Sequence, residues 1–233
     1  MAQKQYNLLQ NRVTRPNQNE VLRQSFYDHA IYPTAGVLNG AFFQQPKGAG
    51  QASYAGAVAG QGKSVHDTNM DLQGMIPAGK VFRVESIEVP FYPGSISTAS
   101  LWLPAAINAF AAAAATTVQV AMQDVANFYQ NGALQFFILS KSYLDEAPLL
   151  RFPPKTHMDY RLAVASNSAT VGEVAMGAAF AVGRSYKLDP EITLTSVQNF
   201  AINLSFGALV PTPSGFNARY GVVLDGILER SSQ

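Results

Sequence analysis

The sequence predicts an all-β protein, folded as an antiparallel β-sandwich with a helical insertion and an extended N-terminal arm. Glycine and proline are frequent, with 18 and 13 residues, and charged residues make up only 13% of the 233 residues. Several short segments alternate between apolar and polar side chains, which is the pattern of half-buried strands. No strand–helix–strand rhythm of the kind that builds parallel sheets recurs along the chain.

The charge balance gives no general argument for a nucleic-acid partner, because the formal net charge is only +1. Residues 1–70 hold six of the 16 Lys and Arg residues and three of the 15 acidic residues, which leaves ten and twelve for the remainder. The N-terminal part is therefore mildly basic. So few charges on a surface of this size suggest that partners cover much of it.

Several features exclude whole classes of protein. The chain has no cysteine, so disulfides, thiolate metal sites and a cysteine nucleophile are excluded. The first residues, MAQKQYNLLQNR, lack the apolar core of a signal peptide. Residues 89–123 carry no charge, but they are rich in alanine and interrupted by Pro93 and Pro104, which argues against a membrane span.

Residues 1–66 are predicted to be an N-terminal arm followed by a loop. Residues 1–30 are polar, and residues 19–30 could form a short helix capped by Asn19. Two interpretations remain open: a flexible or domain-swapped arm, or an arm laid against a membrane or genome. The candidate contact residues of such an arm are Lys4, Arg12, Arg15 and Arg23.

The rest of this N-terminal region predicts little regular structure. Residues 37–43 are typical of a short strand, and residues 46–63 form a glycine- and alanine-rich loop. Residues 60–64, GQGKS, resemble part of a phosphate-binding loop. The first glycine is too close to the lysine, however, and no apolar strand precedes it, so nucleotide binding is not favoured.

Residues 72–94 predict the first core strand. Pro77 and Gly79 form a turn, and residues at home in strands follow from Val81 to Tyr92. The apolar side chains change parity near Glu85, which predicts a β-bulge there.

A helix is predicted over about residues 104–131, as an insertion between strands. Alanines are dense at 111–115, and Val118, Ala121, Val125 and Phe128 recur at the spacing of one buried helical face. Asn131-Gly132 is a typical helix stop. Such a helix would cover one side or one end of the sheets.

The remaining chain predicts a series of strands. A central strand is expected at 134–139, followed by a turn around Asp145-Glu146 and a short strand at 149–152. Residues 173–182 fit either a strand or a tightly packed helix. Further strands are expected at 158–165, 187–195 with a kink or edge at Asp189-Pro190, 200–206, and 219–230 with a possible bulge at Asp225-Gly226.

The total is about eight strands, and a jelly roll is the eight-stranded form of an antiparallel sandwich. The predicted domain is a single eight-stranded antiparallel jelly roll over residues 67–233.

The sequence offers no local pattern for chemistry. His29, His66 and His157 do not stand at metal-binding spacing, although His66 and Asp67 could pair. No serine-nucleophile motif occurs, and the carboxylates are scattered. We therefore expect no enzymatic activity, no cofactor and no metal site.

Four segments carry a resemblance to a known family. They are DTNMDLQGMIPAGKVFRVESIEVPFYPG (67–94), NGALQFFILSKSYLDEAPLLRFPP (131–154), NFAINLSFG (199–207) and YGVVLDGILER (220–230). Their pattern resembles the jelly-roll capsid proteins of tailless icosahedral bacterial viruses that contain an internal membrane. The similarity covers residues 67–230, and the length of the chain suits a single jelly roll better than a double one.

The resemblance implies a structural role in a virion, assembled in the host cytoplasm. Copies of the chain would pack edge to edge into an icosahedral shell, with other capsid proteins as further partners. The basic arm would then contact a neighbour, the membrane or the genome. The alternative is a receptor- or glycan-binding jelly-roll spike that uses Trp102, Tyr143 and Asp145. The histidine spacing argues against a third option, an enzyme on a cupin-like barrel.

Overall fold

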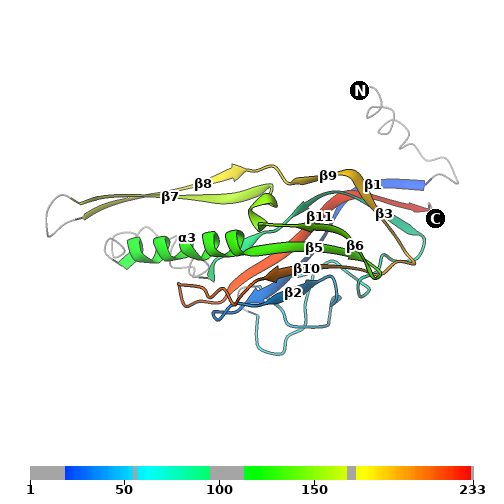
Figure 1. Ribbon diagram of the computed structural model, residues 1–233, viewed down its shortest axis with the longest axis horizontal. Coiled ribbons are helices and arrows are strands. Elements are labelled where there is room, and N and C mark those ends of the chain that lie inside the picture. The colour runs from blue at the N-terminus through cyan, green and yellow to red at the C-terminus, as the bar shows by residue number, and fades with distance from the viewer. Residues whose placement is uncertain (1–18, 55–56, 95–112, 167–171, 232–233) are drawn as a thin grey trace, which may run out of the picture.

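The computed structural model describes residues 19–54, 57–94, 113–166 and 172–231 (Figure 1). The elements in these residues, in chain order, are β1 (Asn19–Tyr32), β2 (Asn39–Phe42), β3 (Lys80–Glu88), β4 (Phe91–Tyr92), α3 (Ala113–Asn131), β5 (Gly132–Ile138), β6 (Lys141–Glu146), the 3₁₀ turn η3 (Leu149–Arg151), β7 (Thr156–Ser166), β8 (Gly172–Val182), β9 (Tyr186–Thr195), β10 (Phe200–Phe206) and β11 (Ala218–Ser231).

Two antiparallel sheets form the body of the molecule. One has the order β1-β11-β3-β9, with the short β4 also paired to β11, and the other has the order β2-β10-β5-β6. Strands β5 and β10 alternate strictly between buried and half-buried residues, because one face of their sheet meets the core. The predicted all-β antiparallel sandwich is confirmed at this level. The described residues form eleven strands, more than the eight expected.

Aromatic rings fill much of the space between the sheets. Phe26 of β1 meets Phe82 of β3 edge to face, with 4.5 Å between the ring centroids. At the other end of the core, the buried ring of Tyr32 lies edge to face against those of Phe91, Phe128 and Tyr220. Such offset and perpendicular ring pairs stabilise a core beyond the area they bury.

The helix predicted over residues 19–30 is wrong, since these residues form most of strand β1. Every residue of β1 pairs with β11, from Asn19 with Ser231 to Tyr32 with Ala218. Phe26, Asp28 and Tyr32 are buried, at the two-residue period of a strand. Pairing with a distant strand has therefore overridden the local helical pattern.

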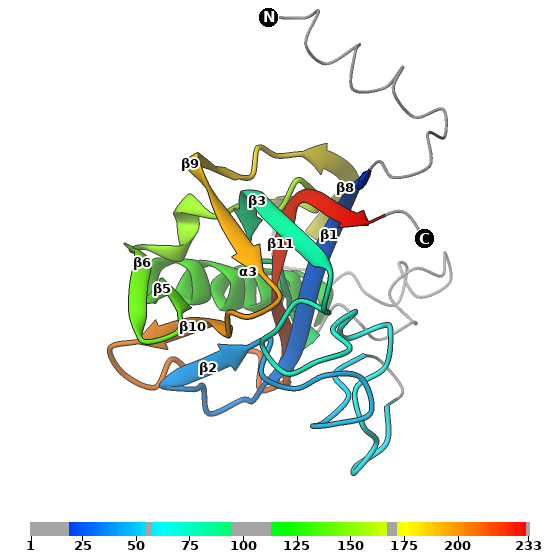
Figure 2. The ribbon, with the colours of Figure 1, turned by 90° about the vertical axis from the view of Figure 1, so that its right-hand side faces the viewer.

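The region predicted as an arm and loop, residues 1–66, belongs to the sandwich from residue 19 onwards. Strand β1 lies in one sheet and β2 in the other, where it pairs with β10. Residues 43–79, here called the long loop, then lead to β3. Figure 2 shows the long loop, in cyan, outside β1 at one side of the sandwich. Residues 1–18, which hold Lys4, Arg12 and Arg15, lie outside the described residues.

The bulge predicted near Glu85 is confirmed, and Asp225-Gly226 lies opposite it without an extra residue of its own. Ser86 pairs with Asp225 and Val84 pairs with Gly226, so Glu85 is the extra residue between two pairs. The pairing of β3 with β9 shifts at the same place. Asp189-Pro190 lies on β9, which ends its sheet and is therefore an edge strand, as the sequence suggested.

The helical insertion is confirmed for α3, and residues 104–112 lie outside the described residues. Phe128 near the end of α3 is 1% exposed and stacks on Phe91, with 4.4 Å between the ring centroids. The helix ends at Asn131, and Gly132 opens β5. The C-terminal part of α3 therefore covers one end of the core.

Two predictions between residues 139 and 154 are wrong. Asp145 and Glu146 do not form a turn, because they pair with Gln135 and Leu134 as part of β6. The chain turns earlier, at Leu139, whose φ of 55° is left-handed. The short strand expected at 149–152 is the 3₁₀ turn η3. The segment 173–182, which the sequence left open, is strand β8.

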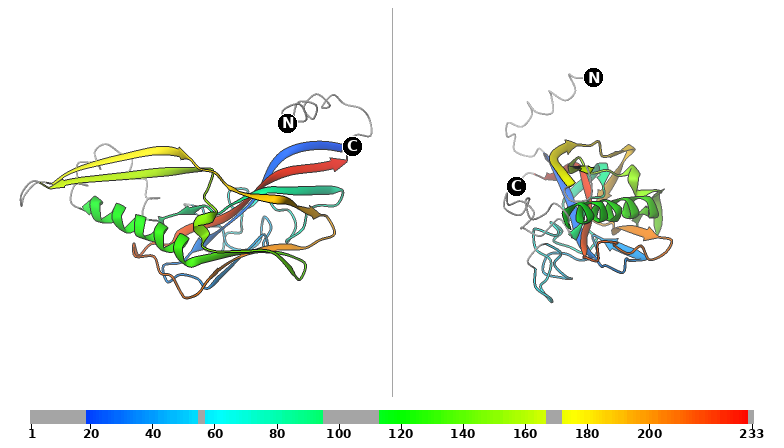
Figure 3. Two further views of the ribbon diagram at one scale, coloured as in Figure 1. Left: turned by 45° about the horizontal axis from the view of Figure 1, so that its top comes forward. Right: turned by 90° about the vertical axis from the view of Figure 1, so that its left-hand side faces the viewer.

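Among the described strands, β7 and β8 pair only with each other, and they form a ribbon that extends away from the sandwich beside α3 (Figures 1 and 3). Lys155, at the base of this ribbon, ties it to the sheet. Its backbone N–H donates to Glu88 Oε2 at 2.8 Å, and its ammonium pairs with Asp225 and Glu88. Gly183, at the other side of the base, donates to the carbonyl of Lys155 at 2.6 Å.

The bulge leaves no room for a side chain at Gly226. A Cβ there would collide with the backbone carbonyl of Arg83, whereas a Cβ at Gly207 would meet nothing within 4 Å. We expect Gly226→Ala to lower the free energy of unfolding by about 1–3 kcal/mol or more, and Gly207→Ala by less than about 0.5 kcal/mol. Urea denaturation of both variants checks this. Equal losses would contradict the bulge geometry.

Candidate functional site

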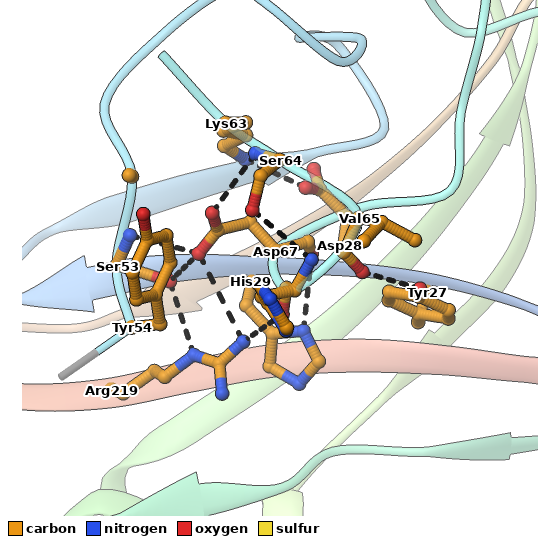
Figure 4. Close-up of polar contacts among 12 residues, drawn as sticks. Tyr27, Asp28, His29, Ser53, Tyr54, Lys63, Ser64, Val65, Asp67 and Arg219 are labelled. Atoms are coloured by element: carbon orange, nitrogen blue, oxygen red, sulfur yellow. Dashed lines mark hydrogen bonds and ion pairs between the residues drawn. The ribbon is translucent and has the colours of Figure 1, made fainter. Parts of the chain in front are cut away.

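A network of buried and half-buried ionisable groups lies where the long loop crosses β1 (Figure 4). Strand β1 contributes Asp28 and His29, and β11 contributes Arg219. The long loop contributes Lys63 and Asp67. Because buried ionisable groups mark functional sites as well as structural networks, this cluster is the first candidate site.

Lys63 and Asp28 form an ion pair in the interior. The distance from Lys63 Nζ to Asp28 Oδ1 is 2.6 Å, and the two side chains are 5% and 0% exposed. The second carboxylate oxygen, Oδ2, accepts a hydrogen bond from the backbone N–H of Phe43 at 2.7 Å. Burial raises the pKa of Asp28 above its ordinary value, although Lys63 and the backbone donors oppose this.

Asp67 organises the tight turn that follows Lys63. Its carboxylate accepts hydrogen bonds from the backbone N–H and hydroxyl of Ser53 at 2.8 and 2.7 Å, and from the N–H of Ser64 at 3.1 Å. Arg219 Nη2 lies 3.9 Å from Asp67 Oδ1. Burial alone would raise the pKa of Asp67, but these hydrogen bonds and the guanidinium lower it below its ordinary value.

His29 joins β1 to the long loop through the backbone carbonyl of Asp67. Its N–H donates to the carbonyl of Asp67 at 2.8 Å, and its ring Nδ1 lies 3.1 Å from the same oxygen. Burial lowers the pKa of His29 to about 4, and the positive charge of Arg219 acts in the same direction. His29 is therefore neutral at pH 7.

The network holds the long loop against β1. A hollow of about 50 Å³ lies between the loop and β1, lined in part by Gln24, Asn69 and Met75. Pockets that hold small molecules usually enclose roughly 300–1,000 Å³. Among the described residues, no three His, Asp or Glu side chains are placed to hold a metal ion.

Of the four predicted contact residues, only Arg23 is described. It lies on β1 with its side chain 68% exposed, and its guanidinium is 3.1 Å from Glu85 Oε2. The predicted contact of Lys4, Arg12, Arg15 and Arg23 with a membrane, genome or neighbour stays a prediction. Of the residues considered for a spike, Trp102 lies outside the described residues, and Tyr143 and Asp145 lie on β6, with the ring of Tyr143 49% exposed.

Sequence reasoning missed the pair of Lys63 and Asp28. The lysine was considered only as part of a phosphate loop, and the aspartate lay within the predicted helix. The two residues stand 35 positions apart with no shared motif. The suggested pairing of His66 with Asp67 is replaced by a ring contact, in which the centroids of His66 and Tyr54 lie 5.4 Å apart.

Comparison of the chain with protein-family models, with curated proteins and with solved structures gives no match. Within the described part of the chain, no helix is both long and apolar enough to cross a membrane.

Removing the lysine of the buried pair isolates a buried carboxylate. We expect Lys63→Met to lower the free energy of unfolding by about 3–5 kcal/mol. Lys47 and Asp71 form a matched control, because they have the same 2.6 Å separation but are 42% and 61% exposed. Lys47→Met should cost at most about 1 kcal/mol. Denaturant titration measures both values, and similar losses would contradict a buried network.

His29 makes the free energy of unfolding depend on pH. The unfolded chain takes up a proton at His29 below its ordinary pKa of 6.5, whereas the folded chain does so only near pH 4. The unfolded state therefore binds more protons between these values, and the free energy of unfolding falls by about 3 kcal/mol as the pH falls from 6.5 to 4.

This dependence is measured by denaturant titrations of the parent and His29→Asn, whose side-chain amide keeps a donor for the carbonyl of Asp67. The slope between pH 6.5 and pH 4 should be shallower in the variant. Parallel curves for the two proteins would show that His29 does not titrate as the structure implies.

Proposed function

We propose that the sandwich is a single jelly roll and that the chain is a structural capsid protein, which self-assembles into an icosahedral viral shell. The observation that carries this proposal is the order in which the strands pair. The ribbon and the apolar surface of the loops support it further.

The strand order matches a long hairpin that has been rolled up. When β4 and the ribbon strands are set aside as insertions, the first strand pairs with the last, β1 with β11. The pairs β2 with β10, β3 with β9 and β5 with β6 follow inwards. Successive pairs alternate between the two sheets. This arrangement supports the proposal of a jelly roll, a fold that occurs in viral capsid proteins, in lectins and in cupins.

The ribbon favours assembly over a solitary role. Strands β7 and β8 have 11 residues each and pair in register along their whole length, from Thr156 with Val182 to Ser166 with Gly172. A two-stranded hairpin is only marginally stable by itself in water. A neighbouring copy of the chain would supply the surface that such a ribbon needs.

Two exposed apolar side chains lie in turns at the opposite end of the sandwich from the ribbon (Figure 1). Leu139 and Val197, in two turns there, are 65% and 83% exposed. The turns are tied together, since the N–H of Leu139 donates to the carbonyl of Asn199 at 2.7 Å. Sister molecules would bury such side chains in a shell, where many weak contacts add up to a stable lattice.

The proposal includes the predicted partners. Copies of the chain, with other capsid proteins, would form the virion in the host cytoplasm. Lys4, Arg12, Arg15 and Arg23 would contact a neighbour, an internal membrane or the genome. Arg23 suits a surface contact because its side chain is exposed, even though it pairs with Glu85.

Shortening the ribbon tests the role given to it. Asp159 and Ala179 pair across the ribbon, so residues 160–178 can be replaced by Asn-Gly, which favours a tight hairpin turn. We expect the parent chain to form shells or large capsomers in sedimentation velocity and negative-stain microscopy. The shortened chain should remain folded by circular dichroism and sediment as a small species.

Two outcomes would count against the proposal. Assembly of the shortened chain at the same concentration as the parent would exclude the ribbon as the contact. A parent chain that stays a monomer or trimer and binds glycans would favour the receptor- or glycan-binding spike instead.

A further inference from the structure

The contact between Lys63 and Asp28 brings an amine and a carboxyl group together in the interior of the protein. The long loop supplies the amine and β1 supplies the carboxyl group, as Figure 4 shows. We propose that the two side chains condense to an intramolecular isopeptide bond, which joins the long loop covalently to β1.

The two groups are placed to react with each other. Lys63 Nζ lies 2.6 Å from Asp28 Oδ1, and the two side chains are 5% and 0% exposed. Holding two reactants in contact replaces a bimolecular encounter by a step within one molecule, which corresponds to a very high effective concentration. Bulk water, which would hydrate both charges and favour hydrolysis, has little access to the pair.

Amide formation requires both groups in their uncharged forms. An amine attacks a carboxyl group only after the ammonium has lost a proton, and a carboxylic acid is a far better acceptor than a carboxylate. Transfer of one proton from Lys63 to Asp28 provides both forms at once. Burial raises the pKa of Asp28 above its ordinary value, although the charge of Lys63 opposes this, and a raised pKa favours the carboxylic acid that the step requires.

The second carboxyl oxygen is held where negative charge would develop. Attack of Nζ on Cγ moves an electron pair onto an oxygen of Asp28. Oδ2 accepts a hydrogen bond from the backbone N–H of Phe43 at 2.7 Å, and this donor lies at the buried start of the long loop. A fixed donor aimed at the developing oxyanion is the arrangement that stabilises acyl-transfer intermediates.

The step balances without any further reactant. The Nζ–Cγ bond forms and the bond from Cγ to Oδ1 breaks. Oδ1 leaves as one water molecule with two protons, one from the carboxyl group and one from the amine nitrogen. Oδ2 becomes the amide oxygen and keeps its hydrogen bond from Phe43, and no atom is oxidised or reduced.

The bond would give the chain a cross-link that it cannot obtain from disulfides, since it has no cysteine. It would close a loop between residues 35 positions apart. A covalent link of this span stabilises a fold chiefly by restricting the unfolded chain, in the same way as a disulfide.

The surface pair of Lys47 and Asp71 provides an internal control. Its Nζ–Oδ1 distance is also 2.6 Å, but its side chains are 42% and 61% exposed. These side chains are open to water, so a short distance alone should not lead to an amide. The proposal therefore expects one cross-link and not two.

The experiment is an intact-mass measurement of the full chain under denaturing conditions, after incubation of the folded protein. We expect a mass lower than the sequence mass by one water. Proteolysis and tandem mass spectrometry should then find a branched peptide that joins Lys63 to Asp28. The variants Lys63→Arg and Asp28→Ala should show their full masses, whereas Lys47→Arg should retain the loss of water.

The sequence mass without loss of water, together with linear peptides that contain Lys63 and Asp28, would overturn the proposal and leave an ion pair only. A loss of water that persists in Lys63→Arg, or that maps to Lys47, would also overturn it. The masses of the parent chain and of Lys47→Arg decide the question even if the variants of the buried pair do not fold. These two masses are measured under denaturing conditions after incubation of the folded proteins.

Discussion

The antiparallel pairing of β1 with β11 is the constraint on which the rest of the structure depends. It joins residues from opposite ends of the described chain over 14 consecutive pairs. Because β1 and β11 lie side by side, strands from the two halves of the intervening chain can also pair with each other. Successive pairs lie in alternate sheets. The bulge at Glu85 lets β3 follow β11 past the change in parity, so that apolar residues on both sides of it face the core.

The buried ionic network lies at the edge strand of this pairing. β1 ends its sheet, and its free edge would offer unpaired backbone groups to other chains. The long loop covers part of that edge, with the N–H of His29 bound to Asp67 and the carbonyl of Ser25 bound to Asn69. Lys63 and Asp28 fix the loop in this position. The ionic network therefore protects an edge strand, whatever further chemistry its buried pair performs.

Local patterns predicted what depends on local residues. The strict alternation at 200–206 and the change in parity at Glu85 gave strand β10 and the bulge directly. β1 was missed because its strand conformation depends on β11, nearly the whole chain away. Asp145 and Glu146 were assigned to a turn because charges are common in turns, yet they are equally suited to an edge strand such as β6. The pair of Lys63 and Asp28 left no sign in the sequence, because only the folded loop brings it together.

We propose that sister molecules cover the ribbon and the apolar turns of the sandwich. Electron cryomicroscopy of the purified full chain tests this most directly. The account predicts closed shells in which each ribbon of β7 and β8 lies against the sandwich of an adjacent copy. Images that contain only separate molecules at high protein concentration, or shells whose ribbons touch no neighbour, would contradict it.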